Sequence, residues 1–205
     1  MNDFDLKAAE WDQNPMHWKR SEAIAKEIIN LIPLKKKMTA LEFGAGTGIT
    51  SFILKDYLKE ITLMDNSSEM VRVMNEKIKS SKVKNLKTLN FNLETDEYKV
   101  RKFDLVFTQM VLHHVIDIEI IIDRFYQLLN PNGYLAIADL YEEDGSFHGN
   151  GFTGHKGFSI EILSDILKKS HFRDIFHKTC FVIDRKISEN ESKQFKVFIM
   201  VAKRN

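Results

Sequence analysis

A chain of 205 residues, 43% of them hydrophobic and 29% charged, has the size and composition of one folded domain and lies far from the disordered class. The 30 lysines and arginines nearly balance 29 acidic residues, and the net charge of +1 disfavours binding to nucleic acid through phosphate neutralisation. The single cysteine, Cys180, excludes an intrachain disulfide and a cysteine-built zinc site. With no long apolar run and an acidic opening segment, we expect a cytoplasmic protein that does not associate with membranes.

The first 33 residues are expected to be largely helical, because Ile24, Ile28 and Leu31 recur at helical spacing until Pro33 ends the pattern. From residue 38 onward, short apolar runs alternate with helical segments, which indicates βαβ units and a parallel sheet. The expected strands are 38–43, 61–65, 86–91, 103–108 and 134–140, and the expected helices are 47–58, 66–79 and 118–129, the second of these with a capping box of Asn66 and Glu69.

The last third of the chain departs from this alternation. Residues 145–157 hold five of the nine glycines and are expected to form a long loop, a kind of segment that often carries function. A helix is expected at 159–169. Two consecutive β segments, 175–183 and 195–202, follow with only the polar linker 188–193 between them, which predicts an antiparallel pair at one edge of an otherwise parallel sheet.

Three glycines alternate where the first expected strand passes into the first expected helix, within Leu41-Glu42-Phe43-Gly44-Ala45-Gly46-Thr47-Gly48. Glycine permits the sharp turn that the backbone needs at this point. The missing side chains also let a ligand lie against backbone amides at the start of the helix. A turn with a purely structural role is the alternative interpretation, but it rarely requires three glycines in five residues.

Two acidic residues support a cofactor site. Glu42 precedes the first glycine by two residues, so its carboxylate is expected near the crevice at the end of the strand. Asp65 ends the second strand 21 positions after Gly44, the separation typical of an acid that accepts hydrogen bonds from ribose hydroxyls. Helix capping is the alternative for Asp65 alone. With the glycine loop, the two acids indicate a ligand that contains adenosine.

The sequence resembles the class I S-adenosylmethionine-dependent methyltransferases, in particular the small single-domain type 11 and type 12 group. The resemblance spans nearly the whole chain and is carried by the glycine motif at 41–48, Asp65 with Asn66, and the segments 103–106, 112–114 and 129–135. It implies a Rossmann-like α/β fold: a seven-stranded mixed sheet of order 3-2-1-4-5-7-6, with strand 7 antiparallel and helices on both faces. The implied cofactor is S-adenosylmethionine.

The resemblance also implies roles for single residues. The loop backbone, at Gly44, Ala45, Gly46 and Gly48, is expected at the methionine portion of the cofactor, with Glu42 orienting its amino group. Asp65 with Asn66 is expected to hold the ribose. Asn92 is expected to meet the adenine amino group, with a backbone contact at Leu93. Thr108 is expected near the methionine carboxylate or the methyl group, and Trp11 on a lid over the crevice. For Trp11, a place in the core is the alternative.

The histidines are the remaining candidates for chemistry. His113 and His114 are adjacent, and adjacent side chains on a helix diverge by about 100°, so we expect no metal site. If the acceptor is a hydroxyl or an amine, a base assists, and His155 is preferred over His148 in the glycine-rich loop, with His114 a further candidate. Solvated loop positions and core packing are the alternatives for these side chains.

Residues 1–205 are therefore interpreted as one methyltransferase domain, with a helical lid at 1–33, a cofactor-binding half at 38–140, and a substrate loop, helix and antiparallel strand pair at 141–205. The expected reaction is in-line methyl transfer to an O, N or S nucleophile of a small molecule. A catalytically silent cofactor-binding module is one alternative. An NAD-dependent oxidoreductase is another alternative. The Gly-x-Gly-x-x-Gly motif of that class, however, requires a third glycine one residue later than Gly48. The acceptor and the oligomeric state stay open.

Overall fold

The computed structural model describes residues 3–188 and 191–205, so the linker predicted at 188–193 and the first two residues of the lid lie partly outside the described residues. Seven strands form one sheet in the order β3-β2-β1-β4-β5-β7-β6. The strands are β1 (Thr39–Phe43), β2 (Glu60–Asp65), β3 (Leu86–Asn90), β4 (Phe103–Gln109), β5 (Leu129–Leu140), β6 (Phe172–Lys186) and β7 (Ser192–Arg204).

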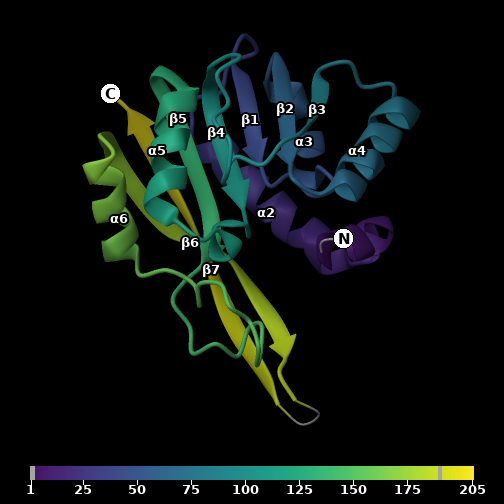
Figure 1. Cartoon of the computed structure of the whole chain (residues 1–205), viewed down its shortest axis with the longest axis vertical. Coiled ribbons are helices and arrows are strands. Elements are labelled where there is room, and N and C mark those ends of the chain that lie inside the picture. The colour runs from purple at the N-terminus through teal and green to yellow at the C-terminus, as the bar shows by residue number, and fades with distance from the viewer. Residues whose placement is uncertain (1–2, 189–190) are drawn as a thin grey trace.

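The strand directions confirm the predicted mixed sheet. Neighbours among β1 to β5 pair in parallel, whereas β7 runs antiparallel to both β5 and β6. The hairpin of β6 and β7 extends well beyond the body of the domain (Figure 1). The parallel strands β1, β2, β4 and β5 therefore end at the same edge of the sheet, where ligands of open α/β sheets bind.

Helices cover both faces of the sheet, as predicted. The longer helices are α2 (Pro15–Leu31), α3 (Ile49–Leu54), α4 (Ser68–Ser81), α5 (Ile118–Leu128) and α6 (Ile160–Lys169). Apolar residues of α2, α3 and α4 pack in one cluster with one face of the sheet, while those of α5 and α6 pack in a second cluster with the other face. The amphipathic period of each helix thus matches a single buried face.

The N-terminal segment is not one continuous helix. It comprises α1 (Asp3–Lys7), the 3₁₀ helix η1 (Ala8–Gln13) and α2, with Asn14 between the last two. Asn14 has an extended backbone and its side chain accepts a hydrogen bond from the Met16 amide, so it caps α2 directly before Pro15. In Figure 1 these elements lie beside the edge of the sheet where the parallel strands end.

The starts of two further elements differ from the predicted ones for local reasons. The N-cap of α4 is Ser67, whose hydroxyl accepts from the Met70 amide, rather than the predicted Asn66. Residues 130–133, which precede the expected strand 134–140, lie inside β5, as an irregularity where Asn132 has a φ of 62°. Among the described residues, no helix combines the length and the apolar character that a membrane crossing needs.

Candidate functional site

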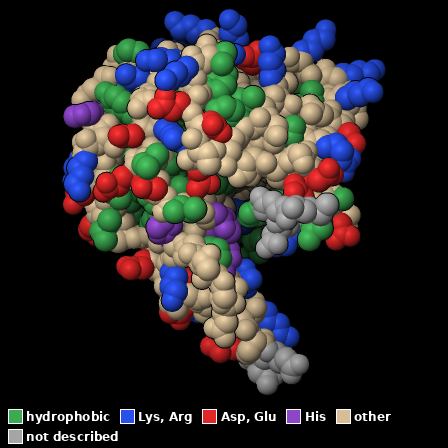
Figure 2. All heavy atoms as spheres, viewed as in Figure 1, with side chains coloured by type: hydrophobic (Ala, Val, Ile, Leu, Met, Phe, Trp, Pro, Cys, Tyr) green, Lys and Arg blue, Asp and Glu red, His purple; other side chains and the backbone are tan. Residues whose placement is uncertain are grey.

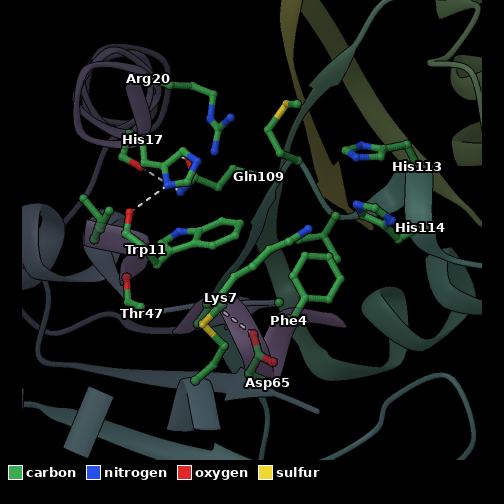
Figure 3. A pocket seen from close by; sticks show the side chains of 18 of the residues that line it. Phe4, Lys7, Trp11, His17, Arg20, Thr47, Asp65, Gln109, His113 and His114 are labelled. Carbon is green, nitrogen blue, oxygen red and sulfur yellow. Dashed lines mark hydrogen bonds between the residues drawn. The ribbon is translucent and has the colours of Figure 1, made fainter. Parts of the chain in front are cut away.

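A cavity of about 810 Å³ opens at the carboxyl ends of the parallel strands, between the sheet and the N-terminal elements. Figure 2 shows it as a hollow with histidine side chains gathered at its edge. In Figure 3, Asp65 lies at one end of the cavity, His113 and His114 at another, and Trp11, His17 and Arg20 along a third wall. Of the predicted site residues, the cavity is lined by Trp11, Gly44, Ala45, Gly46, Asp65, Asn66, His114 and His148.

Gly46 and Gly48, two of the three glycines of the loop, have different functions. Gly46 has a φ of 57°. Of the atoms that the structure describes, a Cβ built on Gly46 would meet only the Trp11 Nε1 atom, at 3.8 Å, so the space above it is open. Gly48 does not line the cavity. It is the N-cap of α3 with a φ of 80°, and a Cβ there would lie 2.5 Å from the Leu63 Cδ2 atom in the core. Gly46 therefore shapes the cavity, whereas Gly48 is required by packing.

Asp65 joins the glycine loop to the start of α4. Its Oδ2 atom accepts a hydrogen bond from the Gly46 amide at 2.7 Å, and its Oδ1 atom accepts from the Ser67 amide at 2.9 Å. Burial raises the pKa of this carboxyl group, while the backbone hydrogen bonds act in the opposite direction. The Asn66 amide is a third backbone donor to this carboxylate. Two carboxylate oxygens can accept about four hydrogen bonds, so Asp65 still has acceptor capacity for a ligand hydroxyl in the cavity that it lines.

Glu42 lies behind the loop rather than in the cavity, contrary to the prediction. It is fully buried and accepts a hydrogen bond from the Ser51 hydroxyl of α3, while its Oε1 atom has no hydrogen-bond partner among the described residues. Burial raises its pKa to about 8. Thr108 is likewise buried outside the cavity with its hydroxyl unpartnered, and the next residue, Gln109, lines the wall instead.

The two residues predicted to contact adenine lie outside the cavity. The Asn92 Oδ1 atom accepts from the Glu94 amide at 2.9 Å, Leu93 is buried, and neither residue lines the cavity. Glu94 lines it instead, and its Oε2 atom accepts from the Ile116 amide at 3.1 Å. Glu94 therefore places a carboxylate in the cavity wall, two positions after Asn92.

The N-terminal elements are fastened over the glycine loop. Asp12 in η1 accepts a hydrogen bond from the Thr47 hydroxyl at 2.5 Å and forms an ion pair with Lys77 of α4 at 2.6 Å. Lys77 also donates to the Thr47 carbonyl oxygen at 2.8 Å. These contacts place Trp11 over Gly46, with its ring 4.2 Å from that of His17.

Arg20 is a cation that sequence reasoning missed. It lies on α2, lines the cavity and is only 9% exposed, and its Nε atom has no hydrogen-bond partner among the described residues. Burial lowers its pKa to about 10. A buried guanidinium group with a free donor attracts a carboxylate or a phosphate. The helical period of the sequence did not predict that Arg20 faces the cavity, because a charged residue on an amphipathic helix normally faces water.

The histidines form a cluster at the far end of the cavity. His113 is buried, and its Nδ1 atom lies 2.6 Å from the Asp139 Oδ1 atom at the end of β5. His114 and His148 are half-buried, with ring centroids 4.2 Å and 4.9 Å from that of His113. Burial, with further lowering by the neighbouring imidazole of His113, brings the pKa of both side chains to about 4.

His155, the preferred base, is not in this cluster and does not line the cavity. Its Nε2 atom lies 3.0 Å from the Val115 carbonyl oxygen, and its amide donates to the His113 carbonyl oxygen. The side chain thus braces the loop against the 3₁₀ helix η3 (Leu112–His114). The pairing of His113 with Asp139 was also missed, because the two residues are 26 positions apart in the sequence.

The fold is that of the class I S-adenosylmethionine-dependent methyltransferases, with a glycine loop, an acid ending the second strand and an antiparallel seventh strand. The open cradle at Gly46, which lines the cavity, fits the methionine portion of that cofactor. The chain belongs to the Methyltransferase domain family, whose profile matches residues 34–191.

Relatives support the same family. A methyltransferase of Schizosaccharomyces pombe is 31% identical over 152 residues, which cover 66% of this chain and 54% of that protein. A demethylmenaquinone methyltransferase of Listeria monocytogenes is 26% identical over 149 residues, covering 71% of this chain and 63% of the relative. The match thus spans little more than half of the first relative and less than two thirds of the second.

Solved structures share the fold at low sequence identity. YcgJ from Bacillus subtilis superposes with a TM-score of 0.76 at 14% identity, covering 88% of this chain and 97% of that one. The Haemonchus contortus phosphoethanolamine N-methyltransferase 2, solved with S-adenosylmethionine, gives a TM-score of 0.71 at 18% identity and covers 91% and 52% of the two chains.

Proposed function

We propose that this methyltransferase transfers the methyl group of S-adenosylmethionine to an oxygen, nitrogen or sulfur nucleophile of a small molecule. One observation carries the proposal: a single cavity joins the glycine loop and Asp65 to the histidine cluster. Its volume of about 810 Å³ is typical of small-molecule sites and holds both a cofactor and a modest acceptor. The net charge of +1 gives no support to a nucleic-acid acceptor.

In this arrangement the cofactor spans the cavity from Glu94 and Asp65, at the adenosine end, to Gly46 and Arg20, at the amino acid end. The N-terminal elements, residues 1–33, act as the lid that Asp12 fastens to the loop, and the 141–205 half supplies the acceptor side through His148. The acceptor's lone pair forms the bond to the methyl carbon. The electron pair of the sulfur–methyl bond returns to sulfur, and the acceptor's proton passes to water.

Calorimetric titration with S-adenosylmethionine, S-adenosylhomocysteine and NAD tests the cofactor half of the proposal. We expect micromolar binding of the first two ligands and none of NAD. Formation of S-adenosylhomocysteine in the presence of phenol, thiol and amine acceptors then tests the transfer. Binding of the cofactor without turnover of any small acceptor, but with turnover of a protein or tRNA, would refute the small-molecule assignment. Binding without any turnover would favour the silent module.

Replacing Arg20 with alanine is expected to weaken S-adenosylmethionine binding about 10- to 100-fold, because a charge-assisted hydrogen bond to the cofactor carboxylate is lost. The exposed neighbour provides a control, and Lys19→Ala should bind like wild type. Decarboxylated S-adenosylmethionine isolates the contact: wild type and Arg20→Ala should bind this analogue equally. An equal loss for both ligands would show that Arg20 supports the lid rather than the carboxylate.

A further inference from the structure

We propose that His113, His114 and His148 bind a divalent transition metal ion, with zinc the best match, at the acceptor end of the cavity. Each of the three side chains offers one imidazole nitrogen, and these nitrogens lie within 4.8 Å of one another. Three histidines with a fourth, open position is a ligand set typical of catalytic zinc. Neither the family nor the cofactor requires such a site.

The local fold explains how adjacent histidines converge. Adjacent side chains on an α-helix diverge by about 100°, and for that reason the sequence predicted no metal site. In the 3₁₀ helix η3 the ring centroids of His113 and His114 instead lie 4.2 Å apart. The loop between β5 and α6 brings the ring centroid of His148 to 5.4 Å from that of His114. The expected divergence is therefore absent in the folded chain, and a third histidine lies beside the pair.

Asp139 prepares His113 as a ligand. Its carboxylate holds the His113 Nδ1 atom at 2.6 Å and also accepts from the His113 and Leu140 amides, so this buried pair is fixed in orientation. With Nδ1 engaged, the nitrogen left to a metal is Nε2. A carboxylate behind a histidine is the usual support for a metal ligand, because it fixes the tautomer and makes the ring more basic.

His148 carries an independent sign of a missing ligand. Its Nε2 atom is buried and has no hydrogen-bond partner among the described residues. The ring is held by Phe152, which stacks on it at 3.9 Å with an interplanar angle of 17°. A buried imidazole nitrogen without a partner is costly unless something binds it.

The three histidine nitrogens need to move only a short distance to bind one zinc ion. In a tetrahedral zinc site the ligand nitrogens are roughly 3.3 Å apart, given zinc–nitrogen bonds of about 2.0–2.1 Å. Closing the present spacing requires the half-buried His114 side chain to rotate and the His148 ring to shift together with the Phe152 ring stacked on it. The open position faces the cavity, whose wall at this end also carries Lys7 and Arg185. If the proposed function holds, this position suits an acceptor that binds as an anion, such as a phenol or a thiol.

Cobalt(II) titration of the tag-free full-length protein tests the proposal, because tetrahedral cobalt absorbs visible light and requires no turnover. We expect one ion per chain, with ligand-field bands. Asp139→Asn should weaken cobalt binding about 10- to 100-fold, and His148→Ala about 100-fold or more. His177→Ala, at an exposed histidine on β6, is the matched control and should bind cobalt like wild type.

Each protein is titrated with S-adenosylmethionine in parallel. Retained cofactor binding shows that a variant is folded, so the loss of cobalt then reports the ligand itself. Equal cobalt affinity in wild type and His148→Ala, or a wild type without ligand-field bands, overturns the metal site and leaves the methyltransferase proposal standing. Loss of cofactor binding in wild type would instead overturn the proposed function.

Discussion

Replacing Gly46 with valine is expected to weaken S-adenosylmethionine binding at least about 100-fold, or about 2.8 kcal/mol, while the protein stays folded. Among the described residues, the Trp11 Nε1 atom alone lies within 4 Å of a Cβ on Gly46, so the new side chain occupies open space that the proposed cofactor needs. The cost to folding is the left-handed backbone, about 1–2 kcal/mol, or roughly 2–8 °C in the melting temperature. Titration calorimetry and thermal unfolding measure the two effects separately.

Gly48 provides the matched control two positions away. A Cβ at Gly48 would overlap the Leu63 side chain, which is fully buried. Gly48→Val should therefore lower the melting temperature by much more than Gly46→Val does. Asp65→Ala separates an effect on cofactor binding from an effect on folding less well, because it removes the acceptor of the Gly46 and Ser67 amides together with the ribose contact. Normal binding by Gly46→Val would contradict the placement of the cofactor.

The fold was predictable because its signals are local. The alternation of apolar runs with amphipathic helices gave the parallel strands, and two β segments without a helix between them gave the antiparallel edge. The start of β5 was placed too late, because residues 130–133 are of types common in turns and form a backbone irregularity within the strand instead. Helix starts shifted by a residue where several capping residues are adjacent, as at Ser67.

The site was predictable only where it follows from strand ends. Gly46 and Asp65 are placed by the strands that precede them, and both line the cavity. Arg20, Glu94 and the His113–Asp139 pair depend on which helix or loop folds over the sheet, and no short sequence pattern records that. His155 was preferred because of the loop that carries it, yet a backbone carbonyl holds its ring outside the cavity.

Replacing Glu42 with glutamine is expected to remove a pH-dependent loss of stability. Burial raises the pKa of Glu42 from an ordinary 4.5 to about 8 in the folded protein. Between these values the folded state binds more protons than the unfolded state, so the free energy of unfolding falls as the pH rises. The contribution of this one group is about 1.4 kcal/mol per pH unit across the window, and is constant below about 4.5 and above about 8.

Urea unfolding of wild type and Glu42→Gln from pH 5 to pH 9 measures the effect as a difference, in which all other titrating groups cancel. The glutamine side chain imitates the neutral acid, and its amide at the unpartnered Oε1 position adds an offset that is the same at every pH. The free energy of unfolding of Glu42→Gln, relative to that of wild type, should rise steadily up to about pH 8. Glu119→Gln, on the exposed surface of α5, should keep the wild-type pH profile. A difference between wild type and Glu42→Gln that does not change with pH would mean that Glu42 is ionised in the folded protein, with a counter-charge behind the glycine loop.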